Sequence, residues 1–331
     1  MPLPKIDFAS HPAYRDFAPD GEPGADHSRE WEREFEHSLS TWKDYEKYWN
    51  YPSKSSLGGA SEVYQKLYRD GAVGLRLTEA VSRALDNACL PYLDKIRARL
   101  FNDPRDRISN STIRISMEEF RKQGDVDLRQ AVMALLEETD FVTLAGRYLG
   151  VKAVQLSYIH FKITDRSTSI ASGTKHVFDD AGLPDPPTSY LHVDTTPFHL
   201  KAIIYLSEVR DLPDGPFQYV LGSNHAARTD FPDYVSRLAT EHYVTSRDLE
   251  GRQRLMKLAP GVRQRLDFGS DLPPDSPAAK DFLRNEHTFT SAEGDAIIFD
   301  PLGVHRGARV EVGERAILQL TLSGVLPDGD T

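Results

Sequence analysis

Apolar residues recur at helical spacing through the first half of the chain and predict a succession of helices. The pattern covers Ser61–Asp70, Thr78–Leu100 and Asp127–Leu149. Gly71 and Gly150 suit the ends of the first and third segments, and Thr78 suits the N-cap of the second. We therefore expect a mainly helical layer over residues 1–150.

Aromatic residues crowd the segment Trp31–Tyr51, again at roughly helical spacing. They either pack into the core or line a substrate pocket. The residues before this segment, 1 to about 30, are rich in Pro, Gly, Asp and Glu, so we expect an irregular arm there.

After Gly150 the spacing of apolar residues changes to two, which indicates strands. The candidates are a strand around Val154–Ile159, then Tyr190–Val193, Leu200–Leu206, Phe217–Val220, Ala296–Phe299, Ala308–Val312 and Ala316–Leu322. Helices followed by strands predict an α+β protein whose sheets form a sandwich or barrel. The polar, Pro-rich segment Thr229–Thr288 is too long for a hairpin and predicts an inserted lid or helical excursion.

The composition fits a soluble globular protein, since 39% of the 331 residues are hydrophobic and 27% are charged. We expect one domain over residues 1–331, with its strand core over 151–325. A net charge of -10 gives no electrostatic reason for a nucleic acid or an anionic membrane as partner. The N-terminus carries no apolar run that would suit a signal peptide or membrane span, so the expected location is the cytoplasm.

Cys89 is the single cysteine, which excludes an internal disulfide and a metal site built from several thiolates. Its place in an apolar helical pattern indicates simple packing rather than a catalytic thiol.

His192 and Asp194 are two residues apart, so on an extended chain their side chains lie on the same face and can reach one ion. A mononuclear iron(II) oxygenase needs a second imidazole and open coordination positions. His305 is the best third ligand, because it follows a turn, an apolar strand and a bend. A His-x-Asp pair alone also occurs by chance, with the histidine merely packed.

Several segments, in a fixed order over about residues 60–325, resemble the phytanoyl-CoA hydroxylase-like family of iron(II)/2-oxoglutarate-dependent dioxygenases. They are Tyr64–Val73, Leu191–Asp194, Leu200–Val209, Gly215–Val220, Gly222–His225, Gly294–Asp295, His305–Gly307 and Arg315. The resemblance implies a double-stranded β-helix, a cupin-like jelly roll, with the N-terminal helices buttressing one sheet. It also implies iron(II) as cofactor and 2-oxoglutarate as cosubstrate.

The resemblance matches His192, Asp194 and His305 to the family's metal ligands and Arg315 to the arginine that binds the distal carboxylate of 2-oxoglutarate. A guanidinium suits that role because it offers two parallel donors to a carboxylate; an ordinary surface salt bridge is the alternative. Some relatives carry a serine two residues after the second histidine, where this chain has Gly307. The candidates to replace that donor are Thr196, Lys162 and Tyr205.

Other residues are candidates for substrate contact. His160 either points into the pocket or packs in the core, and His199 either contacts substrate or supports the metal ligands. Arg306 should point to the opposite side of the strand from His305 and hold a surface carboxylate; it is also the second choice for an anion of the substrate or cosubstrate. His225 resembles a structural turn of the family.

The implied activity is that of a dioxygenase that consumes O2 and 2-oxoglutarate and abstracts hydrogen from a small organic substrate, leading to hydroxylation, desaturation or cyclisation in a biosynthetic tailoring step. Asp194 favours these outcomes, because halogenating relatives carry a small residue there. The alternatives are an iron(II) oxygenase of the same fold that does not use 2-oxoglutarate, and a non-catalytic jelly roll that binds a small ligand. The long loops set the substrate, and the sequence leaves its identity and the oligomeric state open.

Overall fold

The computed structural model describes residues 25–49, 60–103, 110–122, 125–166, 192–194, 196–226, 231, 234–235, 238–239 and 284–325. The helices are α1 (Ala25–Trp42), η3 (Lys43–Tyr48), α2 (Glu62–Asp70), α3 (Glu79–Asn102), α5 (Met117–Lys122), α6 (Val126–Glu138), α7 (Phe141–Leu149) and α10 (Ser223–Ala226). The strands are β1 (Ala72–Leu75), β2 (Thr112–Ser116), β3 (Ala153–Asp165), β4 (His199–Tyr205), β5 (Phe217–Val220), β6 (Glu286–Phe289), β7 (Ala296–Phe299), β8 (His305–Gly307) and β9 (Glu314–Val325). In these ranges, each helix is too short or too polar to cross a membrane.

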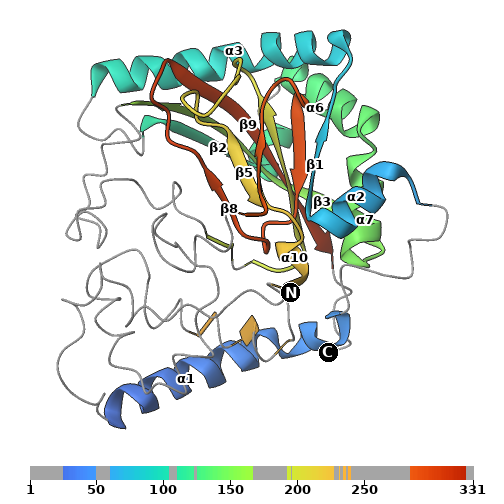
Figure 1. Cartoon of the computed structure of the whole chain (residues 1–331), viewed down its shortest axis with the longest axis vertical. Coiled ribbons are helices and arrows are strands. Elements are labelled where there is room, and N and C mark those ends of the chain that lie inside the picture. Colours follow the sequence, from blue (N-terminus) through green and yellow to red (C-terminus); the bar gives the residue numbers. More distant parts are fainter. Residues whose placement is uncertain are drawn as a thin grey trace.

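Two antiparallel sheets form the core (Figure 1). The larger has the strand order β1-β7-β4-β9-β3-β2 and the smaller the order β6-β5-β8, with His192 bridged to His305 at its edge. The pairing is nested: β3 pairs with β9, His192 with β8, β4 with β7 and β5 with β6. Nested pairs that alternate between two sheets make a double-stranded β-helix, so the expected α+β jelly roll is confirmed.

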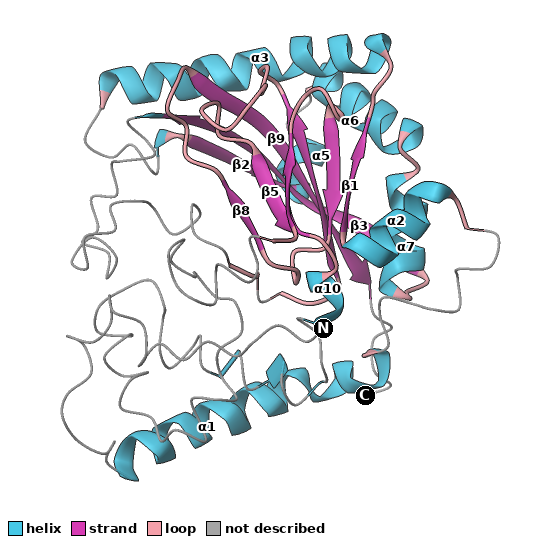
Figure 2. Ribbon diagram, in the orientation of Figure 1, coloured by secondary structure: helices cyan, strands magenta, loops and turns pink. Residues whose placement is uncertain are grey.

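Helices α3 and α7 cover the outer face of the larger sheet (Figure 2), where α3 contacts β2 and β3, and α7 contacts β3, β4 and β9. The predicted ends of α2 and α3 are confirmed, since Ser61 and Thr78 cap them and Gly71 adopts a φ of 82° after α2. Burial raises the pKa of the Cys89 thiol to about 12, as expected of a packed cysteine on α3.

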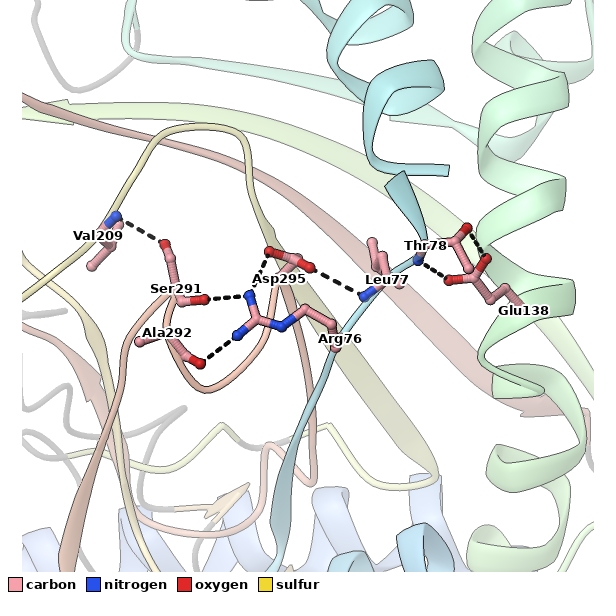
Figure 3. Close-up of polar contacts among 8 residues, drawn as sticks. All are labelled: Arg76, Leu77, Thr78, Glu138, Val209, Ser291, Ala292 and Asp295. Carbon is pink, nitrogen blue, oxygen red and sulfur yellow. Dashed lines mark hydrogen bonds and ion pairs between the residues drawn. The ribbon is translucent and has the colours of Figure 1, made fainter. Parts of the chain in front are cut away.

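A polar network ties this helical layer to the strands (Figure 3). Arg76 donates to the Ser291 carbonyl at 2.9 Å, and the backbone N–H of Leu77 donates to Asp295 Oδ2 at 3.1 Å. Thr78 donates from both its N–H and its hydroxyl to the carboxylate of Glu138 on α6, at 2.6 Å each. The connection from β1 to α3 is therefore held to the β6–β7 turn and to α6 at once.

Two helices stand where the sequence pattern predicted one over Asp127–Leu149. The Thr139 hydroxyl donates to the Leu135 carbonyl at 2.7 Å, and Asp140 adopts a left-handed φ of 48°. This turn separates α6 from α7, so the prediction of a continuous helix was wrong. The apolar spacing continues across the break because both helices pack on the same core.

The sequence predictions need further corrections. Ala308–Val312 is not a strand, because β8 ends at Gly307 and only Val310 makes an isolated bridge, to Asp214. Strands β1, β2, β6 and β8 were not predicted. Strand β6 begins at Glu286, so the predicted insertion ends earlier than residue 288. Helix α1 begins at Ala25, inside the stretch expected to be irregular, and residues 190 and 191 of the predicted strand Tyr190–Val193 lie outside the described residues.

Phe35, Trp42, Tyr45 and Trp49 form a cluster with residues from the predicted insertion, and Tyr45 and Trp49 also pack against the main core. Trp49 lies 4.6 Å from Tyr234 and 5.6 Å from Phe231 between ring centroids, and it also contacts Phe198 at 6.1 Å. These aromatics pack against each other rather than lining the cavity described below, which decides between the two readings of Trp31–Tyr51 for the part described.

Candidate metal centre and adjoining cavity

Two histidines face each other across the edge of the smaller sheet. The backbone N–H of His192 donates to the His305 carbonyl at 3.0 Å, and the N–H of His305 donates back to the His192 carbonyl at 2.8 Å. Residues paired directly across two antiparallel strands point to the same face, and the two imidazole rings lie 4.4 Å apart. Both are buried.

Asp194 completes the cluster because it lies two residues beyond His192 and its N–H donates to the Pro301 carbonyl at 2.8 Å. One ligand atom from each of His192, Asp194 and His305 lies within 4.8 Å of the other two. Two imidazoles and one carboxylate on one side of a centre suit a divalent metal of the iron(II) type and leave positions open for other ligands. The structure therefore brings together the three predicted ligands.

The His305 ring is held in one orientation by the loop before it. Its Nδ1 donates to the Gly303 carbonyl at 2.8 Å, which leaves Nε2 free of a proton and directed toward Asp194, 3.9 Å away. Burial lowers the pKa of His305 to about 3. An unprotonated Nε2 is the form that binds a metal.

This loop depends on close packing against β5. Tyr219 donates to the Asp300 carbonyl at 3.0 Å, and the Asp300 carboxylate accepts from Tyr148 at 2.8 Å. A Cβ on Gly303 would lie 1.7 Å from the Tyr219 hydroxyl oxygen, so no other residue fits. The ligand histidine thus follows a loop whose path is fixed by buried hydrogen bonds.

Gly303→Ala should destabilise the protein by about 3 kcal/mol or more, because Tyr219 must move and its hydrogen bond to Asp300 breaks. Gly313→Ala is the matched control: Gly313 has a φ of 67° but open space around it, so its cost is ~1 kcal/mol from backbone strain alone. Urea unfolding of both variants measures the difference. Equal losses would show that the Gly303 loop tolerates a side chain.

A cavity of about 320 Å³ lies between the two sheets and includes the metal-ligand cluster in its wall. Its lining comes mainly from alternate residues of β3, β4 and β9, with further residues from β2, β5, β7 and β8. Alternation along the strands explains why polar residues gather there while their neighbours face the helices. A cavity of this size admits a small organic ligand.

Arg315 is buried in the wall of this cavity without a carboxylate partner among the described residues. Its guanidinium donates to the Gly215 carbonyl, to the Ala308 carbonyl at 3.4 Å and to Thr164 Oγ1 at 3.5 Å. Burial lowers the pKa of Arg315. A buried guanidinium held only by neutral groups is costly, and an anionic ligand would remove that cost.

Gly307 leaves the space that the guanidinium occupies. A Cβ at this position would lie 3.0 Å from Arg315 Nη2 and 3.2 Å from Nη1, closer than side chains ordinarily pack. The serine that some relatives carry here would therefore crowd Arg315 in this chain.

Lys201 on β4 forms an ion pair with Asp194, and both side chains are largely buried. Burial opposes ionisation of Asp194, but Lys201 and the two histidines offset it, so the pKa of Asp194 is lowered. Burial likewise opposes the charge of Lys201, and Asp194 offsets it, so the pKa of Lys201 is raised. Lys201 therefore keeps the carboxylate ionised and fixes its orientation.

The other predicted site residues divide into two groups. Lys162, Tyr205 and His160 line the cavity. Tyr205 is already committed, since its hydroxyl donates to the Phe289 carbonyl and accepts from the Phe217 N–H, at 2.8 Å each. Lys162 is then the better placed of the replacement donors, near Arg315.

Thr196, His199 and Arg306 do not line this cavity. Thr196 is exposed, and His199 is hydrogen-bonded to the backbone of Thr196. Arg306 points away from His305 as expected and pairs with Glu286 at 2.7 Å, but both groups are buried rather than on the surface. Its charge is thereby satisfied, which corrects the expectation of a substrate or cosubstrate anion there. The side chain of His225 lies outside what the structure describes.

Sequence reasoning missed Lys201 and Arg114 as cavity residues. Lys201 is a cation inside the otherwise apolar run Leu-Lys-Ala-Ile-Ile of β4, a position unusual enough to have marked it. Arg114 lies on the polar face of the alternating sequence Thr-Ile-Arg-Ile-Ser of β2, where a charge gives no such signal.

His160 should make the metal-free protein sensitive to acid. Burial, followed by the charges of Lys162, Arg114 and Lys201, lowers its pKa from 6.5 to about 4. As the pH falls below 6.5, His160 becomes protonated in the unfolded chain but stays neutral in the folded protein. Proton binding therefore favours the unfolded chain, and the free energy of unfolding falls with the pH until about 4.

His160→Gln should reduce this pH slope by up to about 1.4 kcal/mol per pH unit, as urea unfolding between pH 6.5 and 4 would measure. His37→Gln, at an exposed histidine on α1, should leave the slope unchanged. Identical slopes in the wild type and the His160 variant would count against a buried neutral imidazole.

Comparison with known proteins gives structural likenesses only. No protein-family model matches the sequence, and no curated protein sequence matches it. Among solved structures, the non-heme alpha ketoglutarate dependent carbocyclase SnoK from nogalamycin biosynthesis is 17% identical, with a TM-score of 0.45 over 80% of this chain and 84% of that one.

Two further solved structures show similar values. EctD from S. alaskensis with 2-oxoglutarate and 5-hydroxyectoine is 15% identical, with a TM-score of 0.43 over 80% of this chain and 76% of EctD. HygX from Streptomyces hygroscopicus with nickel and 2-oxoglutarate is 14% identical, with a TM-score of 0.42 over 81% of this chain and 88% of HygX. These are remote likenesses, and the chemistry of this chain follows from its own side chains.

Proposed function

We propose that the chain is an iron(II)- and 2-oxoglutarate-dependent oxygenase acting on a small organic substrate. One observation carries the proposal: a cluster of two buried histidines and a partly buried carboxylate shares the wall of one cavity with a buried arginine that has no acidic partner among the described residues. The cluster suits iron(II), and the arginine suits the far carboxylate of a dicarboxylic keto acid.

His192, Asp194 and His305 would hold the metal, with Lys201 keeping Asp194 ionised and the Gly303 carbonyl keeping His305 Nε2 unprotonated. Arg315 would bind and orient 2-oxoglutarate through its distal carboxylate, with Lys162 as a second cation beside it. When bound, iron(II) and 2-oxoglutarate would activate O2, which is the oxidant; 2-oxoglutarate would leave as succinate and CO2 while an unactivated C–H bond of the substrate is converted to an alcohol, an alkene or a ring. The apolar side chains Ile203, Phe217 and Phe299 limit water at the reacting carbon.

The two alternatives fit the cavity less well. An oxygenase that does not use 2-oxoglutarate has no evident need for Arg315, a buried cation that has no carboxylate partner among the described residues. A non-catalytic jelly roll has no need to gather three ligand atoms within 4.8 Å. A biosynthetic tailoring step remains part of the proposal.

The activity test is succinate formation. Iron(II)-loaded protein, supplied with 2-oxoglutarate in air, should release succinate slowly without substrate, and the His305→Ala variant should release none. His287→Ala, at a partly exposed histidine paired with Glu293, is the control and should match the wild type. Succinate at the level of protein-free iron(II) in the wild type would overturn the proposed function.

A further inference from the structure

The cavity wall is strongly cationic in a protein that is acidic as a whole. Among the described residues, its lining contains the cations Arg114, Lys162, Lys201 and Arg315 against the single carboxylate Asp194, a formal charge of +3, whereas the chain carries -10. Iron(II) and the dianion of 2-oxoglutarate would cancel each other. The excess positive charge therefore remains in the loaded site and favours an anionic substrate.

The sheet register places these cations around one point. Arg114 on β2 pairs with His160 on β3, which pairs in turn with Gln319 on β9. Lys162 lies two residues along β3 from His160, on the same face of the sheet. The charges of Lys162, Arg114 and Lys201 all act on the pKa of the His160 imidazole, which marks it as the middle of the group.

Arg114 is prearranged for a ligand rather than for an internal ion pair. Its guanidinium stacks on the ring of Tyr158, 4.0 Å from the centroid, at an exposed position on the rim of the cavity. No carboxylate of the described residues pairs with Arg114 or Lys162. Six other arginines of the described residues do hold carboxylates, whereas Arg99 donates to the Thr112 carbonyl. The six are Arg69, Arg76, Arg83, Arg97, Arg210 and Arg306.

We propose that Arg114, stacked on Tyr158, binds an anionic group of the substrate, a carboxylate or phosphoryl group, with Lys201 as a second cation nearer the metal ligands. The planar guanidinium gives two parallel donors to either group, and the stacked ring limits its freedom before binding. Calling the bound anion a substrate rests on the proposed function. The anion site itself does not depend on a metal. It is distinct from Arg315, which the proposed function reserves for 2-oxoglutarate.

The test uses three probes that share a phenyl ring: phenyl phosphate, benzoate and neutral benzyl alcohol. Calorimetry measures their binding to the full chain, metal-free and loaded with nickel(II) and 2-oxoglutarate. We expect one or both anions to bind in each state and benzyl alcohol to bind more weakly. The comparison of the two anions identifies whether the site prefers a phosphoryl group or a carboxylate.

Arg114→Gln should weaken the preferred anion about tenfold or more, and Arg114→Lys should weaken it less. Neither change should alter the affinity for 2-oxoglutarate. Arg121→Gln, at an exposed arginine of α5, is the matched control and should bind like the wild type. Circular dichroism verifies that the variants fold.

Three results would overturn the anion site. The first is that benzyl alcohol binds as tightly as the anions, and the second is that Arg114→Gln keeps the wild-type affinity for the preferred anion. The third is that, in metal-free protein, only Arg315→Gln loses binding of the preferred anion. The last would place the probe at the cosubstrate arginine instead. Failure of 2-oxoglutarate to bind the wild type would overturn the proposed function alone, since the loss caused by Arg114→Gln would still support an anion site.

Discussion

His305→Ala should lower the affinity of the protein for iron(II) at least about 100-fold. The imidazole is buried, its Nε2 carries no proton, and it supplies one of three ligand atoms within 4.8 Å of one another. Anaerobic titration with iron(II), followed by separation and metal analysis, measures the affinity. The variant removes a ligand without leaving a charge unpaired, so the fold should survive the change.

His287→Ala is the control for this prediction. His287 lies on β6, is partly exposed, pairs with Glu293 at 2.6 Å and is not one of the three residues of the cluster. It should keep the wild-type affinity for iron(II). Retained iron binding in folded His305→Ala protein would mean that the metal, if any, is held elsewhere.

Arg315→Gln should raise the dissociation constant for 2-oxoglutarate about 100-fold, or roughly 3 kcal/mol, while iron(II) binding stays nearly unchanged. The reason is that glutamine cannot supply the positive charge that the buried carboxylate needs. Arg315→Lys should fall between, because it retains the charge but loses the parallel donors. Binding of 2-oxoglutarate to the metal-loaded protein, measured by calorimetry, ranks the three.

Arg210→Gln serves as its control, since Arg210 is exposed and paired with Glu208. Unchanged 2-oxoglutarate binding in Arg315→Gln would show that another cation, Lys162 foremost, holds the distal carboxylate. Loss of iron(II) together with 2-oxoglutarate would show that Arg315 supports the cluster rather than the cosubstrate.

The sequence predicted those elements whose boundaries are set by local chemistry. The caps Ser61 and Thr78 and the left-handed Gly71 mark α2 and α3, and the apolar runs of β5 and β7 are marked by turns. The break at Asp140 was missed, because the apolar spacing on the two sides remains in phase with one core. Strand β2 was also missed; it is a five-residue edge strand between α3 and α5.

The candidate ligands could be predicted because two of them share a strand-like face, which is a local property of residues 192–194. The cationic wall could not, because Arg114, Lys162 and Lys201 come from three strands and meet only through the sheet register. The hydrogen bond from Tyr205 to the Phe289 carbonyl and the ion pair of Arg306 with Glu286 also join residues far apart in the sequence, so neither could be predicted.

The most direct test of the central claim is anaerobic addition of iron(II) and then 2-oxoglutarate to the full chain, followed by visible absorption. Chelation of 2-oxoglutarate to iron held by His192, Asp194 and His305 should produce a weak charge-transfer band that His305→Ala does not give. Iron(II) that binds to the wild type without any such band on addition of 2-oxoglutarate would contradict the account.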